Sequence, residues 1–124
     1  MTATNALARK IAEDFVHAWT GKDVDKALSL LADDVVCEAP TGTFEGVEGY
    51  RGFLEPFANS LIGATVIDVL GNDTNAATVY TTDTPLLKDF RGIDYFTVEN
   101  GRITRVISIF DMLPMAQARG NIQH

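Results

Sequence analysis

Apolar residues recur at helical spacing through the first quarter of the chain. The first apolar stripe ends near Gly21. A second stripe begins after Asp23, a residue type that is favoured at helix N-caps, and ends at Asp33 and Asp34. The positions of the first stripe are Leu7, Ile11, Phe15, Ala18 and Trp19. The pattern predicts two consecutive amphipathic helices.

A short strand and a third helix are expected next. Residues 35–39 form a β-type run that Pro40 stops, and a helical pattern resumes from about Val47. Pro56 interrupts that pattern. Because proline lacks a backbone donor, we expect it to kink or split the third helix.

After Gly63 the pattern becomes β-like and remains so almost to the end. Four strands are predicted, over residues 64–70, 75–84, 90–98 and 102–110. Helices followed by a run of strands indicate an α+β fold, in which the helices lie on one face of an antiparallel sheet.

Two turn geometries compete for the last hairpin. A two-residue turn at Asn100 and Gly101 places Asp94 opposite Ile107, whereas a three-residue loop over residues 99–101, with Gly101 as a bulge, places it opposite Val106. The pattern alone leaves both registers open.

The outward face of this hairpin is apolar, as its inward face is. The outward residues are Ile93, Tyr95, Ile107 and Ile109. Helices of the same chain can cover only one face of the sheet, so a second copy of the chain is expected on the other. The sequence therefore predicts a homodimer.

Composition limits the possible partners and compartments. A chain of 124 residues with 46% hydrophobic residues is sized for one domain, taken as residues 1–124. A net charge of −7, without a basic run, opposes binding to nucleic acid or to anionic membranes. The lone Cys37 and the absence of a signal-like apolar start predict a soluble, cytoplasmic protein.

Several segments resemble bacterial ketosteroid isomerases. They are FVHAWTGKDVDKALSLLADD, ADDVVCEAP, a G-x-E-G motif, FANSL and IDYFTVENGRI. The resemblance extends to the superfamily that also holds SnoaL-like polyketide cyclases, limonene-epoxide hydrolases and nuclear-transport-factor-two-like proteins. It implies a cone-shaped curved sheet wrapped around the N-terminal helices, a cystatin-like α+β barrel, with a hydrophobic pocket and no organic cofactor.

The resemblance also implies roles for individual positions. Where ketosteroid isomerases carry their base this chain has Ala39, and where they carry two tyrosines of the oxyanion network it has Phe15 and Phe57. Only the aspartate that donates a hydrogen bond in its protonated form is kept, as Asp94. Because the family turns this face toward the pocket, we favour the three-residue bulged loop.

We therefore expect Asp94 to be the catalytic residue of a pocket for a compact apolar molecule. The residues expected to contact that ligand are Phe15, Trp19, Ala39, Tyr50, Phe53, Phe57, Tyr80, Phe96, Ser108 and Phe110. Two separated histidines do not make a metal site, so no metal is expected. Isomerase-like or cyclase-like acid–base chemistry is the first hypothesis, and a non-catalytic module that binds a small ligand or a protein is the second.

Overall fold

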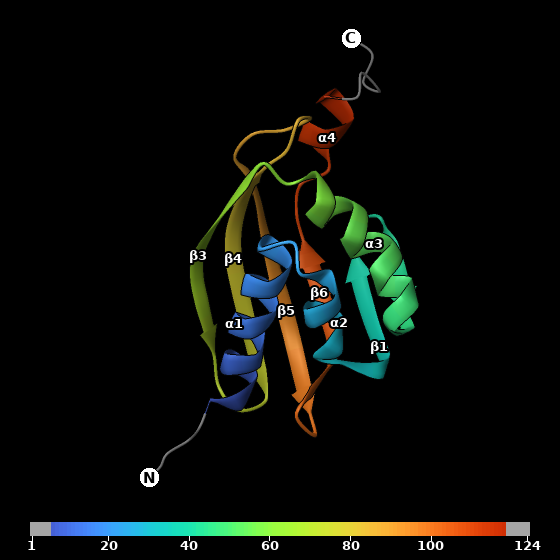
Figure 1. The fold of residues 1–124 in the computed structure, drawn as a ribbon, viewed down its shortest axis with the longest axis vertical. Coiled ribbons are helices and arrows are strands. Elements are labelled where there is room, and N and C mark those ends of the chain that lie inside the picture. Colours follow the sequence, from blue (N-terminus) through green and yellow to red (C-terminus); the bar gives the residue numbers. More distant parts are fainter. Residues whose placement is uncertain (1–5, 119–124) are drawn as a thin grey trace.

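The computed structural model describes residues 6–118 and has the predicted α+β composition (Figure 1). Its elements in chain order are α1 (Leu7–Thr20), α2 (Val24–Ser29), β1 (Leu31–Ala39), β2 (Gly42–Glu45), α3 (Gly46–Ser60), β3 (Gly63–Gly71), β4 (Asn75–Asp83), β5 (Phe90–Glu99), β6 (Arg102–Ile109) and α4 (Leu113–Ala118). The ends of the predicted domain, residues 1–5 and 119–124, lie outside the described residues.

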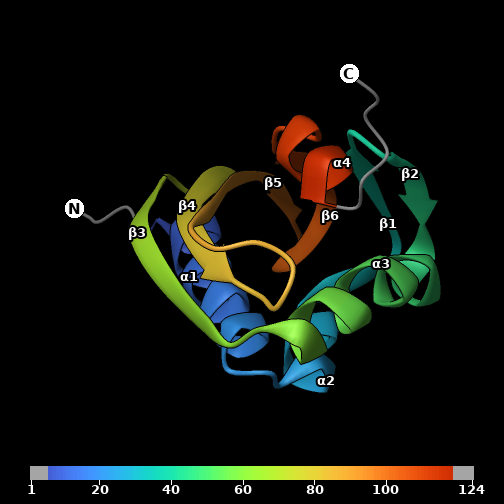
Figure 2. The same ribbon diagram turned by 90° about the horizontal axis from the view of Figure 1, so that it is seen from above.

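The six strands form one curved sheet in the order β2-β1-β6-β5-β4-β3. The edge strands β2 and β3 do not pair with each other, so the sheet is a cone left open on one side (Figure 2). The expected antiparallel arrangement holds for every neighbouring pair except β1 and β6, which run parallel. Since a helix and four strands lie between β1 and β6 in the chain, the local sequence pattern could not reveal their relative direction.

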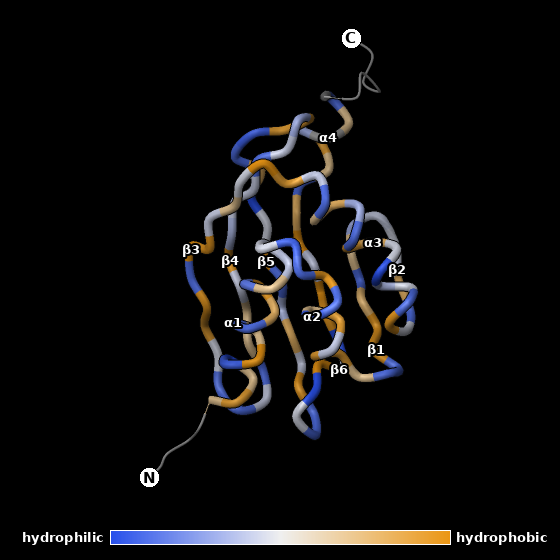
Figure 3. Tube along the Cα trace, in the orientation of Figure 1, coloured by the Kyte–Doolittle hydropathy of each residue, from blue (hydrophilic) through white to orange (hydrophobic). Residues whose placement is uncertain are grey.

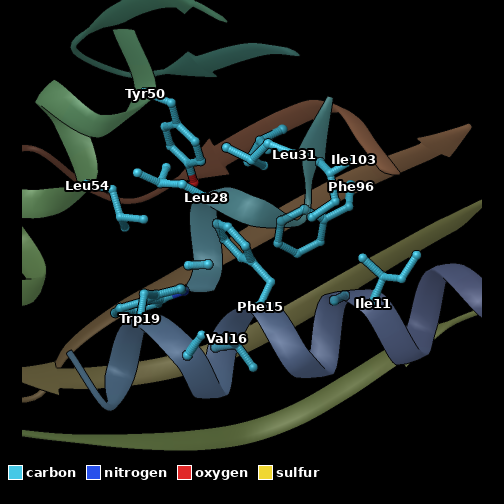
Figure 4. Packing of buried hydrophobic residues seen from close by; sticks show 14 of the residues in the cluster. Ile11, Phe15, Val16, Trp19, Leu28, Leu31, Tyr50, Leu54, Phe96 and Ile103 are labelled. Atoms are coloured by element: carbon cyan, nitrogen blue, oxygen red, sulfur yellow. The ribbon is translucent and has the colours of Figure 1, made fainter. Parts of the chain in front are cut away.

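Helices fill the concave side of the sheet, with α1 against β3, β4 and β5, and α3 against β1 and β2. The predicted stripe of α1 supplies much of the core, and Phe15 is fully buried there (Figure 4). Its ring lies 6.1 Å from that of Tyr50 and 5.5 Å from that of Phe96, between centroids.

Hydrophilic and hydrophobic residues are interspersed along the helices and strands (Figure 3). This distribution is typical of elements that bury one face and expose the other. None of the helices within residues 6–118 has the length and apolar character needed to span a membrane.

The second helix is shorter than predicted. It ends at Ser29, and Asp33 and Asp34 lie in β1 rather than at the helix end. The cause is long-range pairing: the Leu30 carbonyl accepts the Ile103 N–H at 3.0 Å, which draws the chain into the sheet at once. A register irregularity in β1 then spans residues 31–36 and leaves both aspartates exposed.

The region around Pro40 and Pro56 also differs from expectation. The short strand β2, which the sequence pattern did not indicate, pairs with β1. Helix α3 runs through Pro56 without a break. The donor that Pro56 lacks would have bonded to Gly52, and both residues are exposed, so water can satisfy the free carbonyl there.

The last hairpin has a two-residue turn, so the three-residue bulged loop is wrong. Asn100 and Gly101 both have positive φ, 53° and 77°, as a type I′ turn requires. A bulge then leaves Thr104 without a partner, and Asp94 pairs with Ser108. The observed partner is two residues from the expected one, and a strand repeats every two residues, so the predicted inward face is nevertheless correct.

The convex face of the sheet carries the apolar residues expected there. Ile93 pairs with Ile109 and Tyr95 with Ile107. The exposed fractions of Ile93, Tyr95 and Ile109 are 38%, 41% and 54%. This convex patch, Ile93, Tyr95, Ile107 and Ile109, faces away from the helices.

We predict that the convex patch forms a homodimer interface. Replacing both Ile107 and Ile109 with lysine should convert the dimer to a monomer, because four buried ammonium groups would face one another across the two-fold axis. Light scattering at micromolar concentration measures the change. Ile62→Lys is the control, since Ile62 is 70% exposed but lies outside the patch. A native monomer, or a dimer that survives the double substitution, would contradict this interface.

Candidate functional site

A cavity of about 540 Å³ occupies the wide end of the cone. It is bounded by α1, α3, β4, β5, β6 and the segment that joins β4 to β5. Of the residues predicted from the sequence, those that line the cavity are Trp19, Tyr50, Phe53, Phe57, Tyr80, Asp94, Ser108 and Phe110. Sheet alternation and helix periodicity thus bring together side chains from five separate elements.

Three predicted contact residues do not line the cavity. Phe15 and Phe96 have no exposed surface, because they pack against each other in the narrow end of the cone. Ala39 lies at the end of β1 and is not part of the cavity lining, whereas Thr41, two residues later, lines it. The resemblance identified these positions along the chain, but it could not show whether their side chains reach the cavity.

Other lining residues were not among the expected ligand contacts. Thr82 and Phe90 lie on the inward faces of β4 and β5, which the same strand alternation turns inward together with Tyr80 and Asp94. The lining stretch from Thr84 to Leu87 belongs to an irregular loop, which no periodic pattern places. This loop crosses the open end of the cone in Figure 2.

Asp94 lies on β5 and is only 3% exposed. Its Oδ1 accepts the Ser108 hydroxyl at 2.7 Å and the Tyr80 hydroxyl at 3.2 Å. These donors stand on the two strands that flank β5, so sheet register brings all three side chains to one point. Among the residues that the structure describes, Asp94 is the only Asp, Glu, Lys, Arg or His in the cavity lining.

Burial raises the pKa of Asp94 to about 6, and the hydrogen bonds from Ser108 and Tyr80 partly oppose that rise. At pH 7 the carboxylate is then favoured over the acid by about tenfold. The donor role expected from the sequence requires the protonated acid, which is the favoured form below about pH 6. Above that pH the carboxylate is favoured, and it can accept hydrogen bonds or a proton.

The neighbouring ionisable groups remain uncharged. Burial raises the pKa of Tyr50 and of Tyr80 well above 10, and the Asp94 charge adds to both effects. Burial likewise raises the pKa of the Cys37 thiol to about 12, which suits a structural role better than a nucleophilic one. The site thus combines one titrating carboxylate with phenol donors that keep their protons.

The side chains that could bind a metal ion do not form a metal site in the described part of the chain. Among residues 6–118, no three His, Cys, Asp or Glu side chains converge to hold a metal ion. Most of the lining surface comes from aromatic and aliphatic side chains, which suit an apolar organic ligand.

Residues 12–106 match the family described as the SnoaL-like domain. The crystal structure of a protein from Kribbella flavida DSM 17836 has 37% sequence identity and a TM-score of 0.90, covering 94% of this chain and 97% of that one. No curated protein matches the sequence.

Two further solved structures carry named functions. A candidate ketosteroid isomerase from Kribbella flavida DSM 17836 has 22% identity and a TM-score of 0.68, covering 85% of this chain and 78% of that one. A candidate polyketide cyclase from Xanthomonas campestris pv. campestris has 23% identity and a TM-score of 0.72, covering 90% and 96%. At these identities the likeness extends to the fold alone.

We predict that Asp94→Asn stabilises the protein at high pH and not at low pH. The folded pKa of about 6 exceeds the ordinary 3.8. The contribution of Asp94 to stability is therefore full below about pH 4 and is lost as the pH rises through 6. By pH 8 the loss amounts to about 3 kcal/mol, which asparagine avoids because it carries no charge.

Urea unfolding of both proteins at pH 4, 6 and 8 measures this difference. Glu99→Gln is the matched control, because it removes an exposed carboxylate from the same strand. A gain in the free energy of unfolding that is equal at pH 4 and pH 8 would show that Asp94 is not held in an unfavourable charged state.

Proposed function

Because the chain belongs to the SnoaL-like domain family, we propose that it binds a small hydrophobic molecule in the cone and acts on it by cofactor-independent acid–base chemistry. The observation that carries this proposal is the buried carboxylate of Asp94, whose pKa is about 6, in the lining of a mainly apolar cavity. A base is most effective when its pKa lies near the working pH.

The proposed reaction is proton transfer next to a carbonyl group. The Asp94 carboxylate takes a proton from the carbon, and the electron pair of the broken C–H bond moves to the carbonyl oxygen as an enolate. The proton then returns to the same carbon or to a conjugated one, so the sequence needs no oxidant or reductant. Isomerisation and the carbon–carbon bond formation of cyclases both begin from such an enolate.

Tyr80 and Ser108 have a defined part in this chemistry. Both hydroxyls donate to the Asp94 carboxylate in its ionised form. When the proton arrives on Asp94, the negative charge moves to the substrate oxygen, and these two donors hold the carboxyl group less strongly. They can then stabilise the enolate, which is the usual role of fixed donors in such sites.

The cavity favours a neutral substrate over an anionic one. Among residues 6–118, no lysine, arginine or histidine lines the cavity to balance an added negative charge. An anionic ligand would stand beside the ionised Asp94 in a medium of low dielectric constant, where like charges repel strongly. The expected substrate class is thus a neutral ketone or hydroxy-ketone with apolar rings that pack on Trp19, Phe53 and Phe57.

Non-catalytic ligand binding is the second candidate function. It is favoured by Ala39, which stands where the isomerase base would be, and by the distance of Phe15 from the cavity. In that case Asp94 would accept a hydrogen bond from a ligand hydroxyl without transferring a proton. Catalytic turnover of a bound ligand is the observation that distinguishes an enzyme from a non-catalytic binding protein.

We predict that the protein accelerates exchange of the acidic C–H protons of 2-tetralone for deuterium in D₂O. The rate should rise with pH to a plateau above about pH 6, where Asp94 is ionised. Asp94→Asn should lower it by about 10²–10⁴, the usual contribution of a general base. Proton NMR follows the loss of signal.

Controls separate chemistry from binding. Glu99→Gln should exchange at the native rate, and 2-naphthoate should bind more weakly than 2-tetralone because of its charge. Binding of 2-tetralone without exchange that depends on Asp94 would favour the non-catalytic function. Native mass spectrometry of the purified protein then identifies any small molecule retained in the cavity.

A further inference from the structure

Gly92 lies on the inward face of β5, directly opposite Tyr80 on β4. A Cβ atom added to Gly92 would stand 2.8 Å from Cε1 and Oη of Tyr80 and 2.9 Å from Cζ. Non-bonded carbon atoms prefer about 3.5–4.0 Å, so no side chain fits while the ring keeps its place. The aromatic ring of Tyr80 therefore lies across the backbone of β5 at the glycine.

Space, rather than backbone conformation, explains the glycine. The residues of the described chain with left-handed φ values include Gly42, Gly46, Gly71 and Gly101, but not Gly92. Any residue could adopt the backbone angles of Gly92. A glycine inside a strand often marks the close approach of another group, and here that group is the Tyr80 ring.

The position of the ring determines where its hydroxyl points. After crossing Gly92, the Tyr80 side chain reaches the residue two positions along β5, where its hydroxyl lies 3.2 Å from Oδ1 of Asp94. Trp19 contacts the same ring edge to face, with centroids 4.9 Å apart, and is itself 1% exposed. The ring thus has well-packed neighbours that limit its other positions.

We propose that Gly92 is a positioning residue, whose missing side chain lets Tyr80 lie across β5 and donate its hydroxyl hydrogen to Asp94. The functional meaning of this contact rests on the proposed role of Asp94 in proton transfer. Gly92 itself touches neither a substrate nor a reacting atom in that role. It acts through Tyr80 alone.

The consequence is a change in the proton affinity of Asp94. The hydrogen bond from Tyr80 lowers the pKa of Asp94, against the dominant effect of burial. The other titratable groups around Asp94 are Cys37 on β1 and Tyr50 on α3, and both remain protonated near neutral pH. Neither group therefore contributes to a titration step near pH 6 at the carboxyl carbon of Asp94.

The test is a carboxyl ¹³C NMR titration of Asp94 in the full-length protein without ligand. Gly92→Ala should raise the pKa from about 6 to about 7, because a hydrogen bond to a charged group is worth roughly one pKa unit or more. Tyr80→Phe should raise it equally. In the double variant the pKa of Asp94 should equal that in either single variant, since all three lose the same hydrogen bond from the Tyr80 hydroxyl.

Gly52→Ala is the matched control, because a Cβ atom at Gly52 meets nothing within 4 Å. It should leave the pKa of Asp94 unchanged. The proposal is overturned if Gly92→Ala leaves the pKa of Asp94 near 6. It is also overturned if Gly92→Ala, added to Tyr80→Phe, raises this pKa by as much as it does in the native protein. The titration uses no substrate, so an absence of deuterium exchange in the native protein would refute the proposed function without affecting this result.

A stability measurement covers the case in which Gly92→Ala folds poorly. In the Tyr80→Leu background the ring is gone, so Gly92→Ala should no longer lower the midpoint of urea unfolding. An equal loss of stability in both backgrounds would mean that the alanine collides with something other than the Tyr80 ring, which would also overturn the proposal.

Discussion

The packing of α1 into the concave side of the sheet is the contact on which the rest of the structure depends. Phe15 packs against both Tyr50 and Phe96, and all three side chains are almost completely buried. These contacts join α1 to both α3 and β5. Beyond Trp19 the helix ends, and with no further turn of α1 to fill it the wide end remains a cavity.

The cavity places Asp94 in a setting that opposes its charge. Asp94 lies beside the solid core rather than at the mouth, so it loses its hydration, and only two hydroxyls replace the water. A carboxylate in this position lowers the stability of the fold at neutral pH. Groups held in an unfavourable charge state are concentrated at functional sites, where a shifted pKa is useful and the remainder of the core supplies the stability.

The parts of this fold that the sequence predicts are those with a local period. The helical stripe of Phe15 and Trp19 and the alternation around Asp94 and Phe96 depend only on neighbouring residues, and the structure agrees with both. The parallel pairing of β1 with β6 and the early end of α2 depend on contacts about seventy residues apart. No short window of sequence contains that information.

The candidate site was predictable to the same extent. Alternation correctly turns Tyr80, Asp94 and Ser108 to the inside, but it does not say that two hydroxyls meet on one carboxylate oxygen. The contact between Ser108 and Asp94 requires the observed register of β5 and β6, which the bulge at Thr104 determines. The contact between Tyr80 and Asp94 requires a ring that leans across a neighbouring strand, and a glycine in the sequence does not reveal which side chain will cover it.

The bulge at Thr104 links the two faces of the sheet. Without it, the Asn100–Gly101 turn would pair Asp94 with Ile107, and Ser108 would point to the convex side. With it, Ser108 turns inward to Asp94, while Ile107 and Ile109 turn outward. One extra residue in β6 therefore both completes the hydrogen bonding of the buried carboxylate and gathers the apolar patch on the opposite face. A chain that lost the bulge would lose both features together, because successive residues of a strand cannot change faces independently.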